Sequence, residues 1–368
     1  MPKFLTIFPN AENVHLIKDI GMIPFVLYKE YGYVSTIASY NNGAYPYLDA
    51  ELKGLKQLFI EKKFQNERLN VCLFILLNFY KFDALQCYHI STNSIIYLLF
   101  FKFLKFITFS KGLTYLKFDA NDSIKEKKIS KKVIFALKKI KVLSVETKTL
   151  YKHFNNNNLL RGLVNYVPSG YYNFGEDKTV DFSYKENLII TVGRIGNKEK
   201  SNEVLLTAFA DFAKKNDKWK LELVGPIEKE FHFYIEDYFK ENPDLRSRVI
   251  FSGNITDRKE LQEKYRKAKF FVLTSKSESF GIVLVEAIAN GCFLFSTNFS
   301  SAQDITDNGR YGILFDYGDT QTLSKEMLEI ANNEEKLKEE CLNIQNFAIS
   351  YFSWKKISGD IDLILNKK

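Results

Sequence analysis

Two acidic side chains placed eight residues apart indicate where this chain could do chemistry. Glu278 and Glu286 follow the apolar run Phe270–Thr274, at a point where the pattern predicts a helix over 281–290. The first N–H groups of such a helix, at Phe280–Val283, form a site for an anion. Carboxylates that bind hydroxyls, beside amides that bind phosphate, would suit a nucleotide sugar. The alternative is an ordinary solvated loop before a packed helix.

Two basic side chains follow an earlier apolar run. Arg194 and Lys200 stand between the run Leu188–Val192 and a helix predicted over 201–215. Paired cations in such a loop could neutralise a pyrophosphate. The alternative is a surface loop in a lysine-rich protein. The loop contains neither the GxGxxG fingerprint of dinucleotide sites nor the GxxxxGK[ST] pattern of a phosphate-binding P-loop.

Short apolar runs alternate with amphipathic stretches through the second half of the chain, which predicts a parallel sheet with helices on both faces. Ligands of such sheets bind beyond the carboxyl ends of the strands. The predicted strands are Leu188–Val192, Leu221–Val224, Val249–Phe251, Phe270–Thr274 and Phe293–Ser296. The predicted helices cover 201–215, 230–242, 257–268 and 281–290.

The first half shows the same alternation less regularly, and the region 50–80 is ambiguous. The predicted strands are Phe4–Phe8, Val34–Ser39, Ala84–His89, Leu113–Phe118, Val142–Val145 and Leu163–Val167. The predicted helices lie near 20–31, 92–106, 123–139 and 147–154. The fold class is therefore α/β.

Length predicts two lobes, because 368 residues exceed the roughly 250–300 that one core usually holds. The turn residues Pro168, Gly170 and Gly175 mark the connection between them. We expect an N-terminal lobe over 1–168, a linker over 169–186 and a C-terminal lobe over 187–351.

Composition excludes several classes of protein. Apolar residues make up 46% and charged residues 26%, so disorder is excluded as the main state. The four cysteines form no CxxC pair, which predicts neither a disulfide framework nor a zinc site and fits a reducing cytoplasm. The first residues are typical of a strand rather than a signal peptide.

Two stretches of the first half raise the question of a membrane. The apolar run 94–109 is shorter than the about 20 residues that a spanning helix needs, and Lys102 and Lys105 interrupt it. Residues 125–141 contain eight lysines among apolar residues, which predicts a basic amphipathic helix. We expect peripheral contact of 94–141 with an anionic membrane; the alternative is a solvated outer helix. No base-reading motif indicates a nucleic-acid partner.

The two loops and their order carry a resemblance. The segment Ser277-Glu-Ser-Phe-Gly-Ile-Val-Leu-Val-Glu-Ala resembles the Glu-x7-Glu motif of the family-4 retaining glycosyltransferases, including those of bacterial surface-polysaccharide synthesis. Val192-Gly-Arg, with Lys200, is similar to that family's phosphate loop. The other similar stretches are Val167-Pro-Ser-Gly, Leu223-Val-Gly-Pro, Val249-Ile-Phe-Ser-Gly-Asn-Ile, Asn308-Gly-Arg-Tyr-Gly-Ile-Leu-Phe and Phe352-Ser-Trp.

The resemblance implies a GT-B fold, in which two Rossmann-like lobes face a cleft and the C-terminal lobe holds most of the donor. It implies that the C-terminal helix, about 352–368, packs back on the N-terminal lobe. It places Arg194 and Lys200 on the donor phosphates and Glu278 near the donor sugar, as the catalytic residues. The implied donor-binding residues are Gly21, Asn254, Ile255, Ser279, Phe280, Gly281, Ile282, Val283 and Glu286, the last on the ribose.

The N-terminal lobe resembles the family less closely. Gly21 stands where the family has a glycine-containing loop near the donor, although the usual glycine pair is missing. No histidine follows the predicted strand Leu113–Phe118, so Lys117 or Asp119 is an acceptor-side candidate in its place. His89 is a third candidate, although a lone histidine at a strand end is more often structural.

We therefore expect a retaining glycosyltransferase that requires no metal or other cofactor. It would move a hexosyl or N-acetylhexosaminyl group from a nucleotide sugar, with UDP favoured and GDP second, to a hydroxyl of a glycan or glycolipid. The acceptor would belong to a cell-surface polysaccharide such as lipopolysaccharide or capsule, made in the cytoplasm or on the inner face of the cell membrane. The alternatives are a nucleotide-sugar epimerase of the same fold and a non-catalytic membrane- or glycan-binding module.

Overall fold

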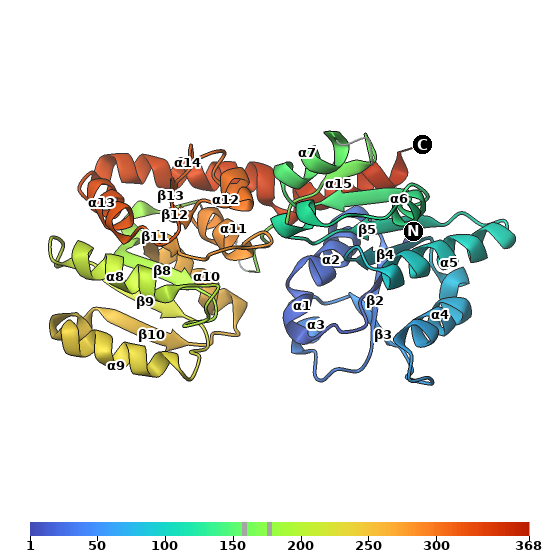
Figure 1. Ribbon diagram of the computed structural model, residues 1–368, viewed down its shortest axis with the longest axis horizontal. Coiled ribbons are helices and arrows are strands. Elements are labelled where there is room, and N and C mark those ends of the chain that lie inside the picture. The colour runs from blue at the N-terminus through green and yellow to red at the C-terminus, as the bar shows by residue number, and fades with distance from the viewer. Residues whose placement is uncertain (157–159, 175–178, 368) are drawn as a thin grey trace. The chain divides into compact units, whose positions relative to one another are not determined.

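A computed structural model describes residues 1–156, 160–174 and 179–367 of the chain, and these form two compact units (Figure 1). The first unit contains Met1–Gly170 together with the C-terminal segment that begins at Trp354. The second unit is Tyr171–Ser353. Each unit has a parallel sheet covered by helices, so each is a Rossmann-like α/β unit.

The described part of the first unit has seven parallel strands in the order β3-β2-β1-β4-β5-β6-β7. Strands β1, β4, β5 and β6 are mostly buried, because helices cover both faces of the sheet. The strands are β1 (Lys3–Ile7), β2 (Val34–Ser39), β3 (Lys56–Phe59), β4 (Ala84–Tyr88), β5 (Leu113–Lys117), β6 (Val142–Val145) and β7 (Val164–Tyr166). The helices are α1 (Asn13–Leu16), α2 (Asp19–Tyr31), α3 (Pro46–Ala50), α4 (Glu67–Asn78), α5 (Thr92–Ile107), α6 (Lys131–Leu137), α7 (Lys148–Asn156) and α15 (Trp354–Asn366), with 3-10 turns η1 (Phe79–Lys81) and η2 (Asp122–Glu126).

The C-terminal helix α15 belongs to the first unit and packs against α2. The hydroxyl of Tyr31 donates to the carbonyl oxygen of Lys355 at 2.7 Å. The hydroxyl of Tyr33 donates to the Asp362 carboxylate at 2.6 Å. The chain therefore returns to its first unit after it leaves the second at Ser353.

The described part of the second unit has six parallel strands in the order β10-β9-β8-β11-β12-β13. The strands are β8 (Glu186–Val192), β9 (Lys220–Val224), β10 (Val249–Gly253), β11 (Ala268–Leu273), β12 (Phe293–Thr297) and β13 (Ile313–Phe315). The helices are α8 (Asn202–Ala213), α9 (Phe231–Glu241), α10 (Arg258–Lys267), α11 (Ile282–Ala289), α12 (Ser300–Ile305), α13 (Thr320–Ala331) and α14 (Glu334–Phe352), with 3-10 turns η3 (Phe182–Tyr184) and η4 (Pro243–Ser247). Central strand β11 is buried throughout.

The helix predicted near 123–139, which contains most of the basic run 125–141, is wrong as a single element. The chain forms the 3-10 turn η2 and then the short helix α6, which begins only at Lys131. Asn121 accepts a hydrogen bond from the N–H of Ser123, and Ser130 accepts one from the N–H of Val133, so each short element has its own cap. Closely spaced lysines between the caps also repel one another in a helix.

The predicted linker 169–186 does not lie free between the units. Its described residues from Tyr171 onward belong to the second unit, where the N–H of Tyr171 donates to the carbonyl of Phe352 at 2.9 Å. Residues 182–184 form η3. Gly175, which the sequence marks as a turn residue, lies outside the described residues.

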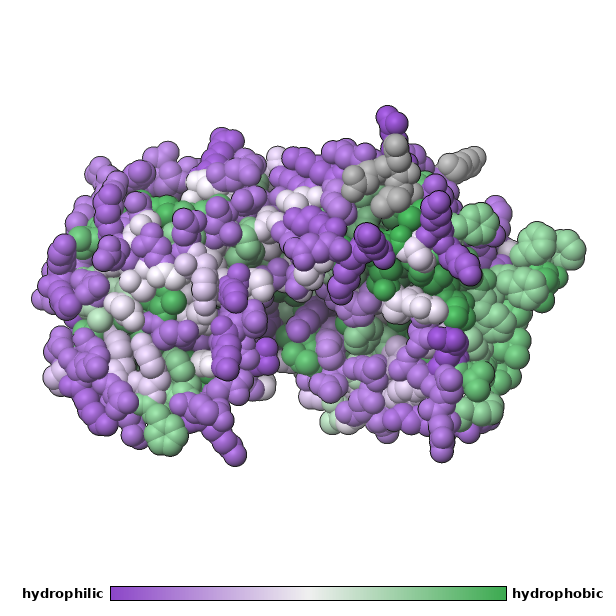
Figure 2. All heavy atoms as spheres, in the orientation of Figure 1, coloured by the Kyte–Doolittle hydropathy of each residue, from purple (hydrophilic) through white to green (hydrophobic). Residues whose placement is uncertain are grey.

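Hydrophobic side chains gather on the surface of the first unit over α4 and α5 (Figures 1 and 2). Helix α5 has 16 residues, and Lys102 and Lys105 interrupt its apolar sequence. Within the described part of the chain, no helix combines the length and the apolar character needed to cross a bilayer.

Candidate active site

The carboxyl ends of β8 and β11 bring two of the predicted site residues together. These strands are neighbours in the second unit's sheet, so the loops that follow them lie side by side. The ammonium group of Lys200 contacts Oε1 of Glu278, and the hydroxyl of Ser275 donates to the same oxygen at 2.6 Å. The side chains of Lys200 and Glu278 are only 20% and 16% exposed. The two sequence-distant loops therefore converge on one partly buried ion pair.

The backbone of the two loops is joined as well. The hydroxyl of Thr274 donates to the carbonyl oxygens of Lys200 and Ser201 at 3.0 and 2.9 Å. The N–H of Lys276 donates to the carbonyl of Glu199 at 2.8 Å. The position of the ion pair is therefore fixed by the strand ends as well as by the attraction between its two charges.

A close backbone contact shapes the phosphate loop that the sequence predicts. A β-carbon on Gly225 would lie 1.7 Å from the carbonyl oxygen of Gly193. Gly225 has φ 143°, and the N–H of Gly193 donates to the carbonyl of Val224 at 2.9 Å. The glycine after β9 thus allows the turn after β8 to pack against it. Arg194 in that turn is exposed, and among the described residues its side chain makes no ion pair or hydrogen bond.

Glycine also sets the start of α11. Gly281 caps the helix with φ 84°, a left-handed conformation that favours glycine. Phe280 is buried and anchors the loop, whereas Ser279 is exposed. The first N–H groups of α11, including those of Ile282 and Val283, have no acceptor within the helix. This helix start lies beside Glu278, because a β-carbon on Gly281 would be 3.7 Å from Cγ of Glu278.

The second acid of the predicted pair has partners that the sequence did not indicate. The Glu286 carboxylate contacts the guanidinium of Arg258 and accepts a hydrogen bond from the hydroxyl of Tyr265 at 3.1 Å. Burial, together with the nearby Glu286 charge, raises the pKa of Tyr265 well above its ordinary value. Any ribose hydroxyl that reached Glu286 would have to share the carboxylate with these groups.

Arg258 and Tyr265 could have been found only in part from the sequence. Both lie in α10, where the pattern predicts an ordinary amphipathic helix. The sequence indicates only where this helix begins, through Asp257, which caps it by accepting hydrogen bonds from the N–H groups of residues 259 and 260. Asn254 is exposed and Ile255 is half-buried in the loop just before this cap, so both lie near the start of α10.

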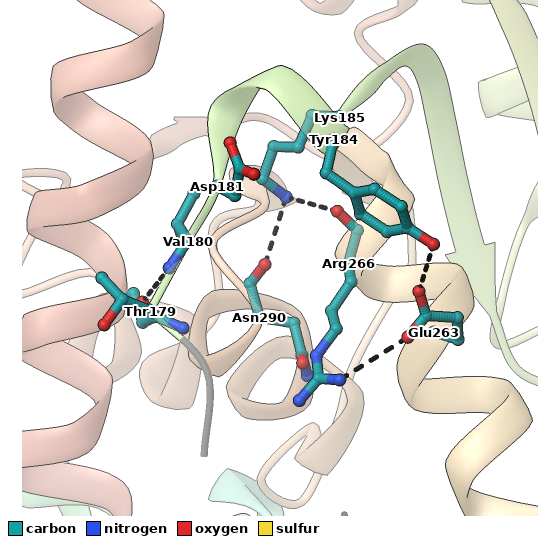
Figure 3. A pocket seen from close by; sticks show the side chains of 9 residues that line it. Thr179, Val180, Asp181, Tyr184, Lys185, Glu263, Arg266 and Asn290 are labelled. Atoms are coloured by element: carbon teal, nitrogen blue, oxygen red, sulfur yellow. Dashed lines mark hydrogen bonds and ion pairs between the residues drawn. The ribbon is translucent and has the colours of Figure 1, made fainter. Parts of the chain in front are cut away.

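A separate cavity of about 300 Å³ lies in the second unit, between the segment that contains η3 and the helix α10 (Figure 3). Buried Lys185 donates hydrogen bonds to the carbonyls of Arg266, Ala268 and Asn290 at 3.2, 2.8 and 3.1 Å. Because these carbonyls end α10 and α11, Lys185 holds together the helices that carry Arg258 and Glu286. The cavity contains none of the predicted site residues.

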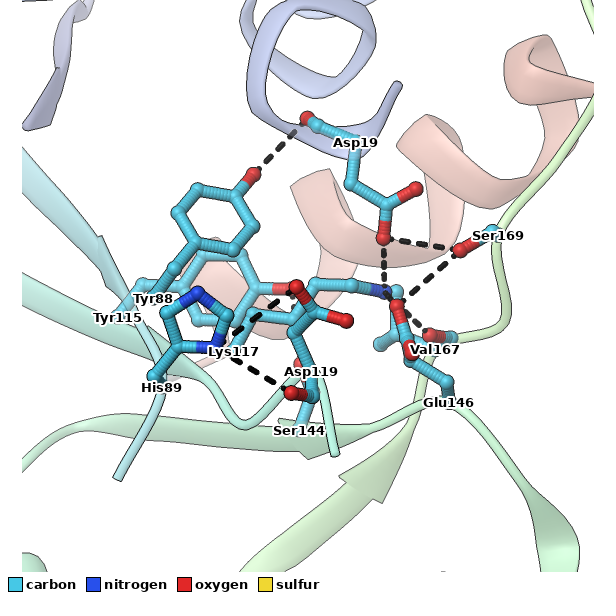
Figure 4. Close-up of polar contacts among 10 residues, drawn as sticks. All are labelled: Asp19, Tyr88, His89, Tyr115, Lys117, Asp119, Ser144, Glu146, Val167 and Ser169. Carbon is cyan, nitrogen blue, oxygen red and sulfur yellow. Dashed lines mark hydrogen bonds and ion pairs between the residues drawn. The ribbon is translucent and has the colours of Figure 1, made fainter. Parts of the chain in front are cut away.

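In the first unit, Lys117 is the centre of a buried cluster at the carboxyl ends of β5, β6 and β7 (Figure 4). Its ammonium group lies 2.7 Å from the Asp19 carboxylate and 3.3 Å from Glu146, and it donates to the carbonyl of Val167 at 2.9 Å. The hydroxyl of Ser169 donates to both carboxylates, at 2.9 and 3.2 Å. The cluster thus joins three strand ends to the start of α2.

The cluster contains two acids but one lysine, and burial acts on the pKa of both acids. Burial raises the pKa of Glu146 well above its ordinary value, although Lys117 acts in the opposite direction. Burial also opposes the charge on Asp19, but Lys117 and hydrogen bonds lower its pKa. Burial therefore favours the neutral acid at Glu146, whereas Lys117 favours the charged carboxylate at Asp19.

The structure corrects two predictions for the N-terminal lobe. Lys117 is completely buried, so it is not placed to touch an acceptor; its role is to position the strand ends and α2. Gly21 is not in a loop but in the first turns of α2, where it is buried. A β-carbon there would lie 1.9 Å from the carbonyl of Leu16, so the glycine is required by the packing of α1 against α2.

The two remaining acceptor-side candidates lie together. His89 and Asp119 follow the neighbouring strands β4 and β5, and Nδ1 of His89 donates to the Asp119 carbonyl at 3.3 Å. Their side chains are 49% and 34% exposed. Both residues have left-handed backbones, with φ 62° and 40°, a strained conformation that is often found at functional sites.

Among the residues that the structure describes, no group of three His, Cys, Asp or Glu side chains is placed to hold a metal ion. That the predicted reaction needs no metal ion stays a prediction.

Comparison with known proteins finds a family match within the second unit. Residues 176–346 match the family model described as glycosyl transferases group 1. Mannosylfructose-phosphate synthase of Agrobacterium fabrum is 26% identical over 185 residues, which are 49% of this chain and 40% of that protein. Alpha-monoglucosyldiacylglycerol synthase of Streptococcus pneumoniae is 28% identical over 167 residues, 45% of this chain and 36% of that protein. The chain thus matches less than half the length of these curated relatives.

Solved structures extend the likeness to the whole chain. Anabaena Alr3699/HepE in complex with UDP and glucose has a TM-score of 0.72 at 14% identity, and the match covers 100% of both chains. WaaG, a glycosyltransferase involved in lipopolysaccharide biosynthesis, has a TM-score of 0.64 at 14% identity, also over 100% of both chains. At this identity the likeness shows the fold alone. The chain therefore has the GT-B fold, and its residues 176–346 match the family model of glycosyl transferases group 1.

Proposed function

We propose that this protein is a retaining glycosyltransferase that uses a nucleotide-sugar donor, with a UDP-sugar favoured and a GDP-sugar second. The observation that carries the proposal is the contact of Lys200 with Glu278 beside the start of α11 at Gly281, inside the region that matches the family. The structural neighbour crystallised with UDP and glucose supports the choice of donor.

Binding of the donor would rearrange the ion pair. Without a donor, Lys200 neutralises Glu278. A diphosphate carries more negative charge than one carboxylate, so it would draw the ammonium toward itself. Glu278 would then be free to accept hydrogen bonds from the hydroxyls of the donor sugar. Exposed Arg194 would add a second cation to the phosphates.

The same groups would promote cleavage of the donor. The breaking bond leaves an oxocarbenium-like sugar and a nucleoside diphosphate on which negative charge grows. Lys200, Arg194 and the N–H groups at the start of α11 would stabilise that charge. Removing one such preorganised donor commonly costs about 2.7–4 kcal/mol of transition-state stabilisation. The acceptor hydroxyl would attack from the same face, and the leaving phosphate oxygen would take its proton.

The acceptor we propose is a hydroxyl of a glycan or glycolipid used in cell-surface polysaccharide synthesis, and the transferred group is a hexosyl or N-acetylhexosaminyl group. The names of similar proteins support this range, since they include a glycolipid synthase and a capsular polysaccharide glycosyltransferase of Staphylococcus aureus, which is 27% identical over 190 residues. His89 and Asp119 are the partly exposed groups at the first unit's strand ends that we propose for the acceptor side. We further propose that the reaction needs no metal and takes place on the cytoplasmic side of the membrane.

The proposal is tested with a panel of UDP- and GDP-sugars and a lipid-linked glycan acceptor, by measuring nucleotide release and product mass. We expect Lys200→Ala and Glu278→Ala each to lower transfer at least about tenfold. Lys198→Ala, which removes an exposed cation from the same loop, is the matched control and should keep full activity.

Three results would contradict the proposal. Full activity in both site variants would show that the site is assigned wrongly. Conversion of the donor into another nucleotide sugar without an acceptor would indicate an epimerase. Failure of every nucleotide sugar to bind would favour a non-catalytic module.

A further inference from the structure

Helix α5 is apolar on two opposite faces, but only one of them is covered. Ile95, Leu98 and Phe101 are buried in the core of the first unit. On the outer face, Phe103 and Phe106 are 56% and 76% exposed. A helix that is apolar on all sides is typical of a segment with an apolar environment on both sides.

The exposed apolar surface continues onto the neighbouring helix. Leu76 and Leu77 of α4 are 46% and 55% exposed, and α4 packs against α5. We call this the α4–α5 surface and define it by Leu76, Leu77, Phe103, Phe106, Ile107 and Phe109. Figure 2 shows hydrophobic side chains gathered over these two helices. Contiguous surfaces of this kind are uncommon on proteins that contact only water.

Phe109 combines two features that are unfavourable in water. It is 99% exposed, and its backbone is left-handed, with φ 52°. The N–H of the next residue, Ser110, donates to the carbonyl of Lys105 at 2.9 Å, which closes the end of α5 at the position where glycine is usual. A phenyl group is therefore held outward at a position where glycine would relieve the backbone strain.

Cations predominate around this surface, although the exposed acid Asp83 lies close enough to Lys105 of α5 to raise its pKa against the lowering effect of burial. Residues 68–82 and 92–118 contain no aspartate or glutamate. Exposed cations lie in both segments: Arg68 and Lys81 near α4, and Lys102 and Lys111 near α5. Anionic lipid headgroups attract such cations. A second copy of the chain, paired symmetrically through the same surface, would instead bring cations against cations.

We propose that the α4–α5 surface inserts its aromatic and aliphatic side chains into the outer part of an anionic lipid bilayer, with the flanking cations at the headgroups. This assignment goes beyond the proposed transfer reaction and does not depend on it. It changes the sequence-based expectation of contact through 94–141: α5 lies largely within that range, α4 lies outside it, and the basic run over 125–141 is neither one helix nor the main contact. Phe135 of α6 is 64% exposed and lies in the basic run, so its substitution distinguishes contact through that run from contact through the α4–α5 surface.

The test is sedimentation of the full-length protein with vesicles of phosphatidylcholine alone and of equal parts phosphatidylcholine and phosphatidylglycerol. We expect binding to the anionic vesicles, and binding at least tenfold weaker for the double variant Phe106→Ser/Phe109→Ser. Phe233→Ser is the matched control, because Phe233 is 72% exposed on α9 of the second unit. Equal binding of the double variant and the control would overturn the proposal.

A second variant separates loss of the phenyl group from loss of fold. Phe109→Gly should raise the melting temperature, because it relieves the left-handed backbone, and should weaken binding to anionic vesicles. The thermal shift produced by UDP should be the same in all these variants, so failure here and failure of the proposed function are distinguishable. A larger loss of binding in Phe135→Ser than in the double variant would assign the contact to α6 and overturn the proposal. Light scattering that shows a dimer abolished by the double variant would also overturn it.

Discussion

The ion pair between Lys200 and Glu278 can be measured as a coupling energy. We predict that Lys200→Ala, Glu278→Ala and the double variant form a non-additive cycle in the free energy of unfolding of the second unit. An exposed ion pair contributes about 0.2–1 kcal/mol. Removing one partner of a fully buried pair costs about 3–5 kcal/mol.

The structure places this pair between those limits. The side chains are 20% and 16% exposed, and Ser275 keeps one hydrogen bond to Glu278 when the lysine is removed. We therefore expect each single variant to lose about 1.5–3 kcal/mol and the coupling energy to be about 1–2 kcal/mol.

The assay follows urea unfolding by tryptophan fluorescence. The chain has two tryptophans, Trp219 in the second unit and Trp354 in the first. A Trp354→Phe background therefore reports the second unit alone. The exposed pair formed by Lys214 and Asp211 at the C-terminal end of α8 is the control, with an expected coupling below about 0.5 kcal/mol. A coupling for Lys200 and Glu278 no larger than that of the control would show that the two side chains form no partly buried ion pair in solution.

Three further predictions concern groups that hold the site and the first unit together. Gly225→Ala should destabilise the second unit and weaken UDP binding, since its β-carbon would lie 1.7 Å from a backbone oxygen. Gly318→Ala is the control, because a β-carbon there would meet nothing within 4 Å. The control should lose less than half as much free energy of unfolding in a urea titration and keep its UDP affinity. Equal effects would contradict the close contact. Tyr265→Phe removes the hydroxyl that donates to Glu286 and should cost about 1.5–3 kcal/mol by urea unfolding; no loss would show that this hydrogen bond is absent. Because the folded pKa of Glu146 is raised, the stability it contributes is complete below its ordinary pKa of 4.5 and is lost as the pH rises through the folded value. Glu146→Gln should therefore gain melting temperature relative to the wild type as the pH rises above 4.5, and parallel curves would contradict the raised pKa of Glu146.

Most strands of the fold could be predicted, because the sequence of a strand that is buried on both faces is an uninterrupted apolar run. β2 and β6 have the predicted bounds, and β11 differs by one or two residues at each end. β3 was missed because it is an edge strand of four residues with largely exposed side chains, so its sequence carries no such run. The basic helix was predicted wrongly because the apolar spacing was correct for a helix, while the caps at Asn121 and Ser130 divide the segment.

The site was predictable where its residues follow strand ends in the same sheet. Lys200 and Glu278 come together because β8 and β11 are neighbours, and chain order and motif spacing carry that information. The partners of Glu286 could not be found in this way. They lie on α10, and which face of a helix meets another helix depends on tertiary packing.

The role of Lys117 could not be predicted from the sequence for the same reason, since it depends on tertiary packing. Its partners, Asp19 and Glu146, are far from it in the chain, and a lysine at the end of a strand is usually exposed. Only the three-dimensional structure shows that two carboxylates compensate its burial.

Binding of a nucleotide at the second unit's strand ends is tested by calorimetric titration of UDP and GDP into the wild-type protein, Lys200→Ala and the control Lys198→Ala. The wild type and the control should bind one nucleotide at a single site with equal affinity. Lys200→Ala should bind that nucleotide at least about tenfold more weakly, a loss of about 1.4 kcal/mol. Absence of binding in the wild type, or unchanged affinity in Lys200→Ala, would contradict the claim that the loops after β8 and β11 hold the diphosphate of an activated sugar.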